Sequence, residues 1–348
     1  MKVFNNIYQR IISVENLFAA WEAFHSDKGN KPDVLEYEVN LEPNLFQLHR
    51  DLRSKKYRHG SYTSFYIHDP KQRHIHKATV RDRILHRAIY NVLNPIFEPT
   101  FISSSFSCRI GKGTHKGVEA VETMVRSITR NGTKSVFVLK CDVQKFFFRI
   151  DHGLLLTILK RKLQDDDTVW LLDEVISSLS SSDSGVVGKG LPIGNLTSQL
   201  FANVYMNEFD QFMKQTLRIK RYARYTDDFL IIAETTEFLE SLLPQIQAFL
   251  RERLAFELHP KKTSIRKVHQ GIDFLGYTIF PHHRLVRTKT RQRIFRKLKQ
   301  KVQQYKVEAI GENKLAQSLQ SYRGVLSHAN TYQLREQMEN QVWFWLHE

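Results

Sequence analysis

Two adjacent carboxylates interrupt an apolar segment of the chain. The segment RYTDDFLIIA, residues 224–233, places Asp227 and Asp228 directly before a run of Phe, Leu and Ile. Such a run is typical of a buried strand, where two neighbouring anions repel each other and resist dehydration. A turn between two strands would account for the pair in purely structural terms, because Asp is common in turns. The alternative is a function that requires concentrated negative charge.

A third carboxylate occurs in a matching context. In the segment VFVLKCDVQKFFF, Asp142 follows a short apolar run that is typical of a buried strand. If the two strands are neighbours in one sheet, the three carboxylates converge at its edge. That edge would hold two divalent cations about 4 Å apart, and the cations would remove the repulsion. Ligands that are all oxygen favour Mg²⁺ over zinc, and such a pair of ions aligns a 3′-hydroxyl with a triphosphate for in-line displacement.

The composition indicates a polyanionic partner. Among 348 residues, 52 Lys and Arg outweigh 36 Asp and Glu, which gives a formal charge of +16. No apolar stretch approaches the roughly 20 residues that a membrane span needs, and the N-terminus lacks a signal-peptide pattern. The two cysteines, Cys108 and Cys141, have no metal-binding spacing. We therefore expect a soluble, cytoplasmic protein that binds nucleic acid and no membrane.

The elements that must position the carboxylates follow from hydrophobic periodicity and turn residues. Residues 1–58 have helical period, with Ser13 as an N-cap candidate, and a basic turn divides residues 61–80 into a β-hairpin. Further helices are expected at 81–97, 152–163, 168–179 and 196–213, and strands at 135–143, 224–233, 262–268 and 271–280. This mixture predicts an α+β fold.

The C-terminal part of the chain is strongly basic. From Phe274 to Val307 the sequence has ten Lys and Arg and no Asp or Glu. A solvated helix face is one explanation, but ten unbalanced cations favour contact with a phosphate backbone. The contacts would come from Arg291, Arg293, Arg296, Lys297, Lys299 and Lys301. The apolar segment QVWFWL near the end is expected to pack against the rest of the protein.

Five motifs occur along the chain in a characteristic order: LKCDVQKFFFRIDH, GLPIGNLTSQLFANVYMNEFD, RYTDDFLIIA, HPKKTSI and GIDFLGYTIF. Their order and spacing resemble the palm motifs of reverse transcriptases, and the segment from Asp69 to His115 resembles their fingers. The tetrad Tyr225-Thr226-Asp227-Asp228 looks like the YxDD box of that family. The resemblance implies a right-hand polymerase architecture with fingers, an antiparallel-sheet palm and a helical basic thumb. The expected domains are an N-terminal helical extension (1–58), fingers (59–135, with part of 156–190), palm (136–280) and thumb (281–348).

The resemblance also implies roles for single residues. Asp142, Asp227 and Asp228 would hold two Mg²⁺ ions, for which Mn²⁺ can substitute, together with the backbone carbonyl of Val143. Lys262 would protonate the leaving pyrophosphate. The incoming dNTP would be bound by Lys71, Arg73, Phe147, Ile193 and Gln199, and the primer strand would be gripped by Phe274, Leu275 and Gly276.

Several of these roles have structural alternatives. Phe147 would block a ribose 2′-hydroxyl, but it belongs to three consecutive Phe residues, of which at least one must face the core. Lys71 and Arg73 lie in a predicted turn, where cations are common. Lys261 beside Lys262 leaves the register of the catalytic lysine open by one residue. The primer-grip residues would look the same in an ordinary strand.

The third motif points to a subgroup. Many bacterial members carry Gln-Gly followed by Ser-Pro, whereas this chain has Ile193-Gly194 and Ser198-Gln199. These departures resemble the enzymes of diversity-generating retroelements, which copy a template RNA, substitute at template adenines and act with a small basic accessory variability protein. The expected function is therefore cDNA synthesis by an error-prone RNA-directed DNA polymerase. Because isoleucine cannot make the polar contact that glutamine can make, we expect Ile193 to contribute to the errors.

Other functions stay open on the sequence. They are a reverse transcriptase of a phage-defence or group II intron-like system, a catalytically silent nucleic-acid-binding scaffold, and a nucleotide cyclase with a palm-like sheet. No Asp follows Asp273 and only five Glu do. We therefore expect neither an RNase H nor an endonuclease domain.

Overall fold

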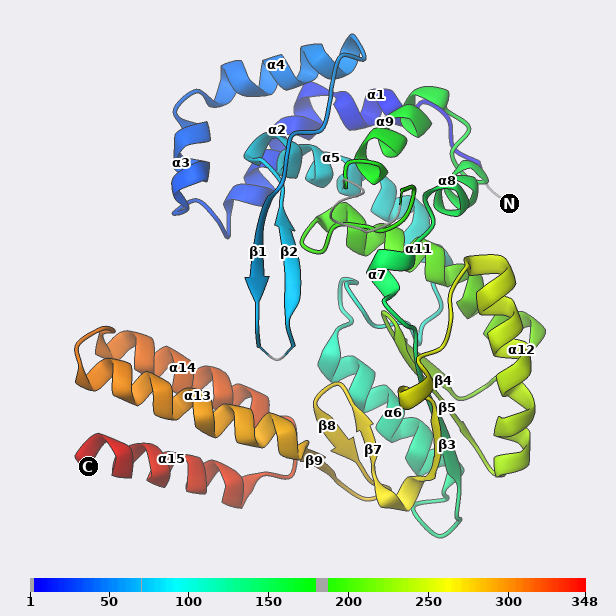
Figure 1. Cartoon of the computed structure of the whole chain (residues 1–348), viewed down its shortest axis with the longest axis vertical. Coiled ribbons are helices and arrows are strands. Elements are labelled where there is room, and N and C mark those ends of the chain that lie inside the picture. The colour runs from blue at the N-terminus through cyan, green and yellow to red at the C-terminus, as the bar shows by residue number, and fades with distance from the viewer. Residues whose placement is uncertain (1–2, 70, 180–186) are drawn as a thin grey trace. The chain divides into compact units, whose positions relative to one another are not determined.

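The computed structural model describes residues 3–69, 71–179 and 187–348 (Figure 1). Contacts within the chain divide it into two compact units, which are described separately. The first consists of Met1–Arg109, Asp142–Ile219 and Pro244–Pro260, and the second of Ile110–Cys141, Lys220–Leu243 and Lys261–Glu348. One boundary falls inside helix α12 (Thr236–Leu254) at Pro244, whose missing N–H removes one helical hydrogen bond.

The first unit is largely helical, as the N-terminal periodicity predicts. Ser13 caps α2, because its side chain accepts a hydrogen bond from the Asn16 N–H at 3.2 Å. Helix α5 is capped in the same way by Thr79, and it packs against α2 and α11. The helices are α1 (Ile7–Ile12), α2 (Val14–His25), α3 (Pro32–Glu38), α4 (Leu41–Arg53), α5 (Val80–Phe97), α7 (Phe146–Arg149), α8 (His152–Lys160), α9 (Asp166–Ile176) and α11 (Leu196–Gln211).

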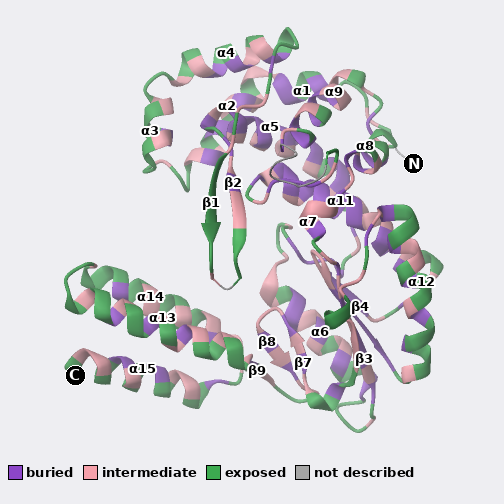
Figure 2. Cartoon of the chain, in the orientation of Figure 1, coloured by how far each residue is buried: buried purple, intermediate pink, exposed green. Residues whose placement is uncertain are grey.

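A two-stranded hairpin extends from the helices of the first unit, and it confirms the hairpin predicted around the basic turn. Strands β1 (Thr63–Ile67) and β2 (Arg73–Lys77) are antiparallel, with Thr63 opposite Lys77 and Ile67 opposite Arg73. Every residue of β1 is exposed, whereas His76 of β2 is only 1% exposed. The hairpin is therefore attached to the helices mainly through β2 (Figure 2).

The second unit contains a four-stranded sheet in the order β4-β5-β3-β6. Helix α6 (Thr114–Ile128) contacts β4 and β5 and buries Val118, Val121 and Val125, which recur at helical spacing. The apolar residues of β5 are all buried, so the sheet carries the core of this unit. The strands are β3 (Phe137–Asp142), β4 (Tyr222–Tyr225), β5 (Asp228–Ala233) and β6 (Ser264–Lys267).

A small antiparallel sheet and three helices complete the second unit. The sheet has the order β7 (Ile272–Phe274), β8 (Tyr277–Ile279) and β9 (Arg284–Val286), and the helices are α13 (Thr288–Lys306), α14 (Glu312–Ser327) and α15 (Tyr332–His347). Helix α13 buries Ile294, Leu298 and Val302 and exposes most of its other side (Figure 2).

The segment QVWFWL packs against the protein as expected, because α15 contacts α13 and α14, but two of its three aromatic residues stay exposed. Val342 is 4% exposed, but Trp343 is 63% and Phe344 is 50% exposed. Helix α15 contacts α13 and α14 along one side only, so consecutive residues of the segment point in different directions. The mixed helix and strand content confirms the α+β prediction. No helix in the described ranges has the length and apolar character to cross a membrane.

Candidate active site

The adjacent carboxylates lie at a tight turn in the second unit. Tyr225 pairs with Asp228 in the antiparallel register, so only Thr226 and Asp227 connect β4 to β5. Thr226 has a φ of 56°, which is unusual for a β-branched residue. Such strain persists where the surrounding structure enforces it, and it is concentrated at functional sites. The pair therefore lies in a turn, as the structural explanation predicts, and this turn is compatible with the predicted function, which stays a prediction.

A buried arginine holds this turn in place. The side chain of Arg224 is fully buried, and its guanidinium donates a hydrogen bond of 3.0 Å to the Thr226 carbonyl. A buried guanidinium is costly unless acceptors surround it. The bond therefore fixes the backbone at the point where the chain turns towards Asp227.

The third carboxylate, Asp142, ends the strand next to β5. Strand β3 lies between β5 and β6 in the sheet, so the two carboxylate-bearing strands are neighbours, the condition on which the predicted convergence depended. The Lys140 ammonium, two residues before Asp142, lies 3.2 Å from Oδ2 of Asp228. The end of β3 thus approaches the start of β5. Asp142 itself belongs to the first unit, where its carbonyl accepts a hydrogen bond of 2.7 Å from His259 N–H.

Of the three consecutive phenylalanines that follow Asp142, one lies in the core. Val143 is 1% exposed and forms a single antiparallel bridge with Leu258. Phe146 is 4% exposed and packs against Phe256 with ring centroids 5.2 Å apart. Phe147 is half-buried, and its carbonyl accepts a hydrogen bond of 2.8 Å from Leu191 N–H. Phe146 therefore fills the core, which leaves Phe147 available for the predicted contact with a sugar.

The loop that contains Ile193 is fixed against the hairpin. The Ile193 carbonyl accepts a hydrogen bond of 3.1 Å from His76 N–H in β2. Gly194 has a φ of 128°, and a Cβ there would lie 3.2 Å from the His76 carbonyl oxygen. Glycine is therefore required by both its backbone angle and the close approach of β2. Ile193 is half-buried, in a loop that cannot easily move away from the hairpin.

Buried polar side chains form further contacts between the segment that follows Ile193 and the rest of the first unit. Asn195 is 3% exposed, and its amide donates to the Tyr62 hydroxyl at 3.0 Å. Thr197 Oγ1 lies 2.7 Å from Nδ1 of His86, whose Nε2 lies 3.1 Å from Nε2 of His59. Burial and, secondly, the neighbouring His59 lower the pKa of His86 to about 3. His86 is therefore neutral at physiological pH, as a closely packed histidine pair requires.

The remaining predicted dNTP contacts come from two elements of the first unit. Lys71 and Arg73 are both exposed, Lys71 beyond the strands of the hairpin and Arg73 as the first residue of β2. Gln199 is half-buried in the first turn of α11, four residues after Asn195. The structure thus brings the hairpin and the Ile193 loop together, and it leaves the two cations accessible.

Lys262 and the primer-grip residues lie in the second unit. Lys262 is exposed and precedes β6, the strand that pairs with β3 through Ser264 and Lys140. Phe274 is buried, whereas Leu275 and Gly276 form the two-residue turn between β7 and β8, both with positive φ. Such a turn normally prefers Asn-Gly. Leu275 therefore occupies a strained position at the tip of the hairpin.

The predicted phosphate contacts are distributed over α13. Arg291, Arg296 and Lys299 are exposed, and the other three cations, Arg293, Lys297 and Lys301, are half-buried. The Arg291 guanidinium donates to the Gln337 side chain on α15 at 3.1 Å. The helix is thus both a packing element and a cationic surface.

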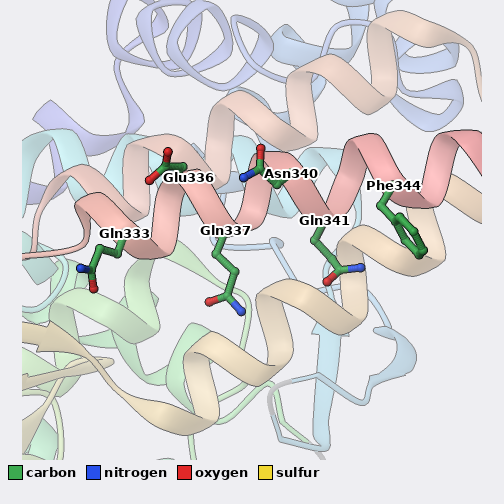
Figure 3. A pocket seen from close by; sticks show the side chains of 6 residues that line it. All are labelled: Gln333, Glu336, Gln337, Asn340, Gln341 and Phe344. Atoms are coloured by element: carbon green, nitrogen blue, oxygen red, sulfur yellow. The ribbon is translucent and has the colours of Figure 1, made fainter.

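A shallow hollow of about 540 Å³ lies on α15 (Figure 3). It is lined by Gln333, Glu336, Gln337, Asn340, Gln341 and Phe344. This lining includes none of the carboxylates predicted to hold metal.

The donor chemistry at β5 fits a hard divalent cation. Carboxylate oxygens are the ligands that Mg²⁺ prefers, and Asp227 and Asp228 are both half-buried at one turn. Within the described residues, no three His, Cys, Asp or Glu side chains form a gathered metal centre. A group of three would need Asp142, which belongs to the other unit.

Comparison with known proteins agrees with the arrangement of strands and carboxylates. A family described as reverse transcriptase (RNA-dependent DNA polymerase) matches residues 67–279, more than half of the chain. The chain belongs to this family. Among solved structures, telomerase from Candida albicans in complex with a fragment of telomeric RNA matches with a TM-score of 0.50 and 12% identity, over 76% of this chain and 54% of that one. The similarity confirms the right-hand polymerase fold.

Two curated bacterial proteins are similar to this reverse transcriptase-family chain. Protein YkfC of Escherichia coli is 28% identical over 61% of this chain and 62% of its own length. The group II intron-encoded protein LtrA of Lactococcus lactis is 22% identical over 80% of this chain and 57% of its own. The chain spans about three fifths of the length of these relatives. The closer resemblance to diversity-generating retroelements stays a prediction.

Three groups that support the candidate site were not predicted from the sequence: Lys140, Arg224 and the histidine pair. A signal was present for the first two, because each is a lone cation in a strand predicted to be buried. A charge there must have a buried partner: Lys140 contacts the Asp228 carboxylate, and Arg224 binds the Thr226 carbonyl. No sequence signal indicated that His59 and His86 would meet.

The low pKa of His86 predicts acid sensitivity. In the unfolded chain a histidine has a pKa of ~6.5. Between that pH and about 3, the unfolded state therefore binds a proton at His86 that the folded state does not bind. The free energy of unfolding must therefore fall as the pH falls through this window, by up to ~1.4 kcal/mol per pH unit. Denaturant unfolding at pH 7, 6, 5 and 4 should give a flatter profile for His86→Gln. The control His269→Gln, at an exposed histidine, should keep the wild-type dependence of the unfolding free energy on pH. The same dependence in all three proteins would contradict the low pKa of His86.

Proposed function

We propose that the chain is an RNA-directed DNA polymerase that extends a primer strand on an RNA template with dNTPs. The observation that carries this proposal is the Asp227–Asp228 turn, held by buried Arg224 and placed beside the strand that ends at Asp142. Membership of the reverse transcriptase family supports the same chemistry. The scaffold and cyclase alternatives lack an observation in their favour.

The three carboxylates would hold two Mg²⁺ ions, or Mn²⁺ in their place, with the Val143 carbonyl as a further ligand. When bound, the ions supply charge stabilisation for the attacking and leaving oxygens. The protein's own contribution is position: the strained turn orients Asp227 and Asp228, and β3 orients Asp142. Lys262 would deliver a proton to the leaving pyrophosphate.

The first unit would supply the dNTP site. Lys71 would bind phosphate through an ammonium on a flexible side chain. Arg73 would bind it through two hydrogen bonds from its planar guanidinium. Phe147 would exclude a 2′-hydroxyl, and Ile193 with Gln199 would contact the base-pair side of the nucleotide. The bond between the Ile193 carbonyl and His76 supports this grouping, because it connects the hairpin to the loop.

The second unit would hold the primer and template. Phe274, Leu275 and Gly276 would grip the primer, and the cations of α13 would contact phosphates. We retain the proposed division into an N-terminal extension, fingers, palm and thumb. Within the described residues Cys108 and Cys141 form no disulfide, which suits a reducing compartment such as the cytoplasm.

Within the family, we propose an error-prone enzyme of a diversity-generating retroelement that works with a small basic accessory protein. Support comes from Ile193-Gly194 and Ser198-Gln199 in the third motif. A group II intron-like role is the second candidate, and the similarity to LtrA favours it. The two differ in fidelity opposite template adenine.

Primer extension on a defined RNA template with Mg²⁺ and dNTPs tests the polymerase proposal. Asp228→Asn should reduce extension by at least about a hundredfold, because the charge stabilisation of the transition state is removed. Asp27→Asn, at an exposed carboxylate in the first unit, should retain wild-type extension. Equal extension by wild type and Asp228→Asn would reject the proposed active site.

Sequencing of the extension products tests the role of Ile193. Ile193→Gln restores a hydrogen-bonding side chain and should lower misincorporation opposite template adenine by about tenfold. Ile193→Leu, which adds no polar group, should keep the wild-type spectrum. An unchanged spectrum in the glutamine variant would remove Ile193 from the explanation, and accurate extension by the wild type would favour the intron-like candidate.

The salt dependence of template–primer binding tests α13. Replacing Arg291, Arg296 and Lys299 by Gln should lower the slope of log Kd against log salt by about 0.7–0.9 for each phosphate that the helix no longer neutralises. Arg253→Gln, at an exposed position in α12, serves as the control for removing a cation elsewhere. A slope that is the same in the triple variant as in the wild type would contradict the phosphate contacts.

A further inference from the structure

One charged side chain in the sheet has no place in the proposed chemistry. Lys140 lies in β3 between Leu139 and Cys141, both of which are fully buried. Its own side chain is only 25% exposed. A lysine at such a position loses hydration and rotamer freedom, so its partners must compensate.

Both partners of the Lys140 ammonium are described within the second unit. Its Nζ lies 3.2 Å from Oδ2 of Asp228, and it donates a hydrogen bond of 2.5 Å to the backbone carbonyl of Asp273. Asp228 begins β5 at the carboxylate turn, and Asp273 lies in β7, directly before Phe274. One ammonium thus bridges the carboxylate turn and the β7–β8 hairpin.

The bridge continues beyond the hairpin. The Asp273 carboxylate accepts a hydrogen bond of 2.8 Å from the Thr278 hydroxyl and lies 3.2 Å from Nε of Arg287. The Arg287 N–H donates to the Gly276 carbonyl at 3.0 Å, and α13 begins one residue later. A continuous polar chain therefore runs from Asp228 through Lys140 and Asp273 to the start of the basic helix.

We propose that Lys140 is a positioning residue that orients the Asp228 carboxylate and ties it to the β7–β8 hairpin. This inference rests on the proposed polymerase function for its consequence. The ammonium stabilises the carboxylate pair when no divalent cation is bound, because it supplies a positive charge at Asp228. Its second bond, to the Asp273 carbonyl, makes the position of that charge depend on the hairpin expected to hold the primer.

The geometry argues for positioning rather than for neutralisation alone. A lysine that only neutralised the turn could direct its ammonium to solvent, since long cationic side chains readily do so. Here the ammonium is held from two sides by groups that are 45 residues apart in sequence, Asp228 and Asp273. The second anchor is a backbone carbonyl in β7, and the side chain of the same residue, Asp273, also contacts Thr278 and Arg287.

A double-mutant cycle on unfolding tests the bridge without any assay of activity. Wild type, Lys140→Met, Asp228→Asn and the double variant are unfolded with denaturant in the presence of EDTA. We expect a coupling of about tenfold in the unfolding equilibrium constant between the two sites, since groups in direct contact do not act additively. Lys134→Met is the matched control, because its ammonium pairs with Glu234 elsewhere in the same unit. It should show no coupling with Asp228→Asn.

Metal binding gives a second readout. Removing a positive charge beside the carboxylates should tighten Mn²⁺ binding to Lys140→Met, measured by electron paramagnetic resonance, by at least about threefold. Extension by the same variant should nevertheless be slower, because Asp228 is no longer oriented. Lys140→Arg keeps the positive charge and can reach both the Asp228 carboxylate and the Asp273 carbonyl. It should therefore restore wild-type Mn²⁺ affinity and part of the extension rate.

The outcomes separate this inference from the proposed function. No coupling between Lys140 and Asp228 would overturn the bridge, even if Asp228→Asn abolishes extension. Coupling together with full extension by Asp228→Asn would support the bridge and reject the proposed function. Weaker Mn²⁺ binding in Lys140→Met, or wild-type extension by it, would overturn the positioning role.

Discussion

The structure depends on holding two negatively charged carboxylates, those of Asp227 and Asp228, close together where they are partly removed from water. Asp227 and Asp228 lie at the start of a strand whose remaining residues are all buried. Leaving such charges unbalanced costs several kcal/mol each, by the usual order of magnitude. One cation from the same sheet offsets this cost, because the Lys140 ammonium contacts the carboxylate of Asp228. A second, the buried Arg224 guanidinium, binds the Thr226 carbonyl and so holds the backbone of the turn.

The first unit fixes its candidate nucleotide-binding residues by a different means. Its Ile193 loop is held by backbone contact with β2 and by neutral, buried polar side chains, among them Asn195 and His86. Neutral groups can be packed closely without counter-charges, provided that each hydrogen bond is made. This leaves Lys71 and Arg73 as exposed charges on the hairpin, accessible to an anionic ligand.

The family and the finer function rest on different kinds of observation. Reverse transcriptase motifs extend over most of the chain, and a family match over more than half of it agrees with them. The proposed assignment to a diversity-generating retroelement depends on a few residues around Ile193, whose predicted effect is on the fidelity of copying. The curated relatives YkfC and LtrA, at 28% and 22% identity, support the family.

The sequence by itself determined two things: the helical or strand periodicity of the elements, and which three carboxylates are the candidates for metal binding. Alternating and helical patterns are local properties, so the hairpin, the strand before Asp142 and the buried stripe of α13 were predictable. Tertiary structure alone decided which of three phenylalanines fills the core, which aromatics of α15 are exposed, and that two histidines far apart in sequence meet. It also decided the partners of Lys140, which lie on β5 and β7. Local pattern shows that a buried cation needs a partner, but only the pairing of distant strands determines which one it finds.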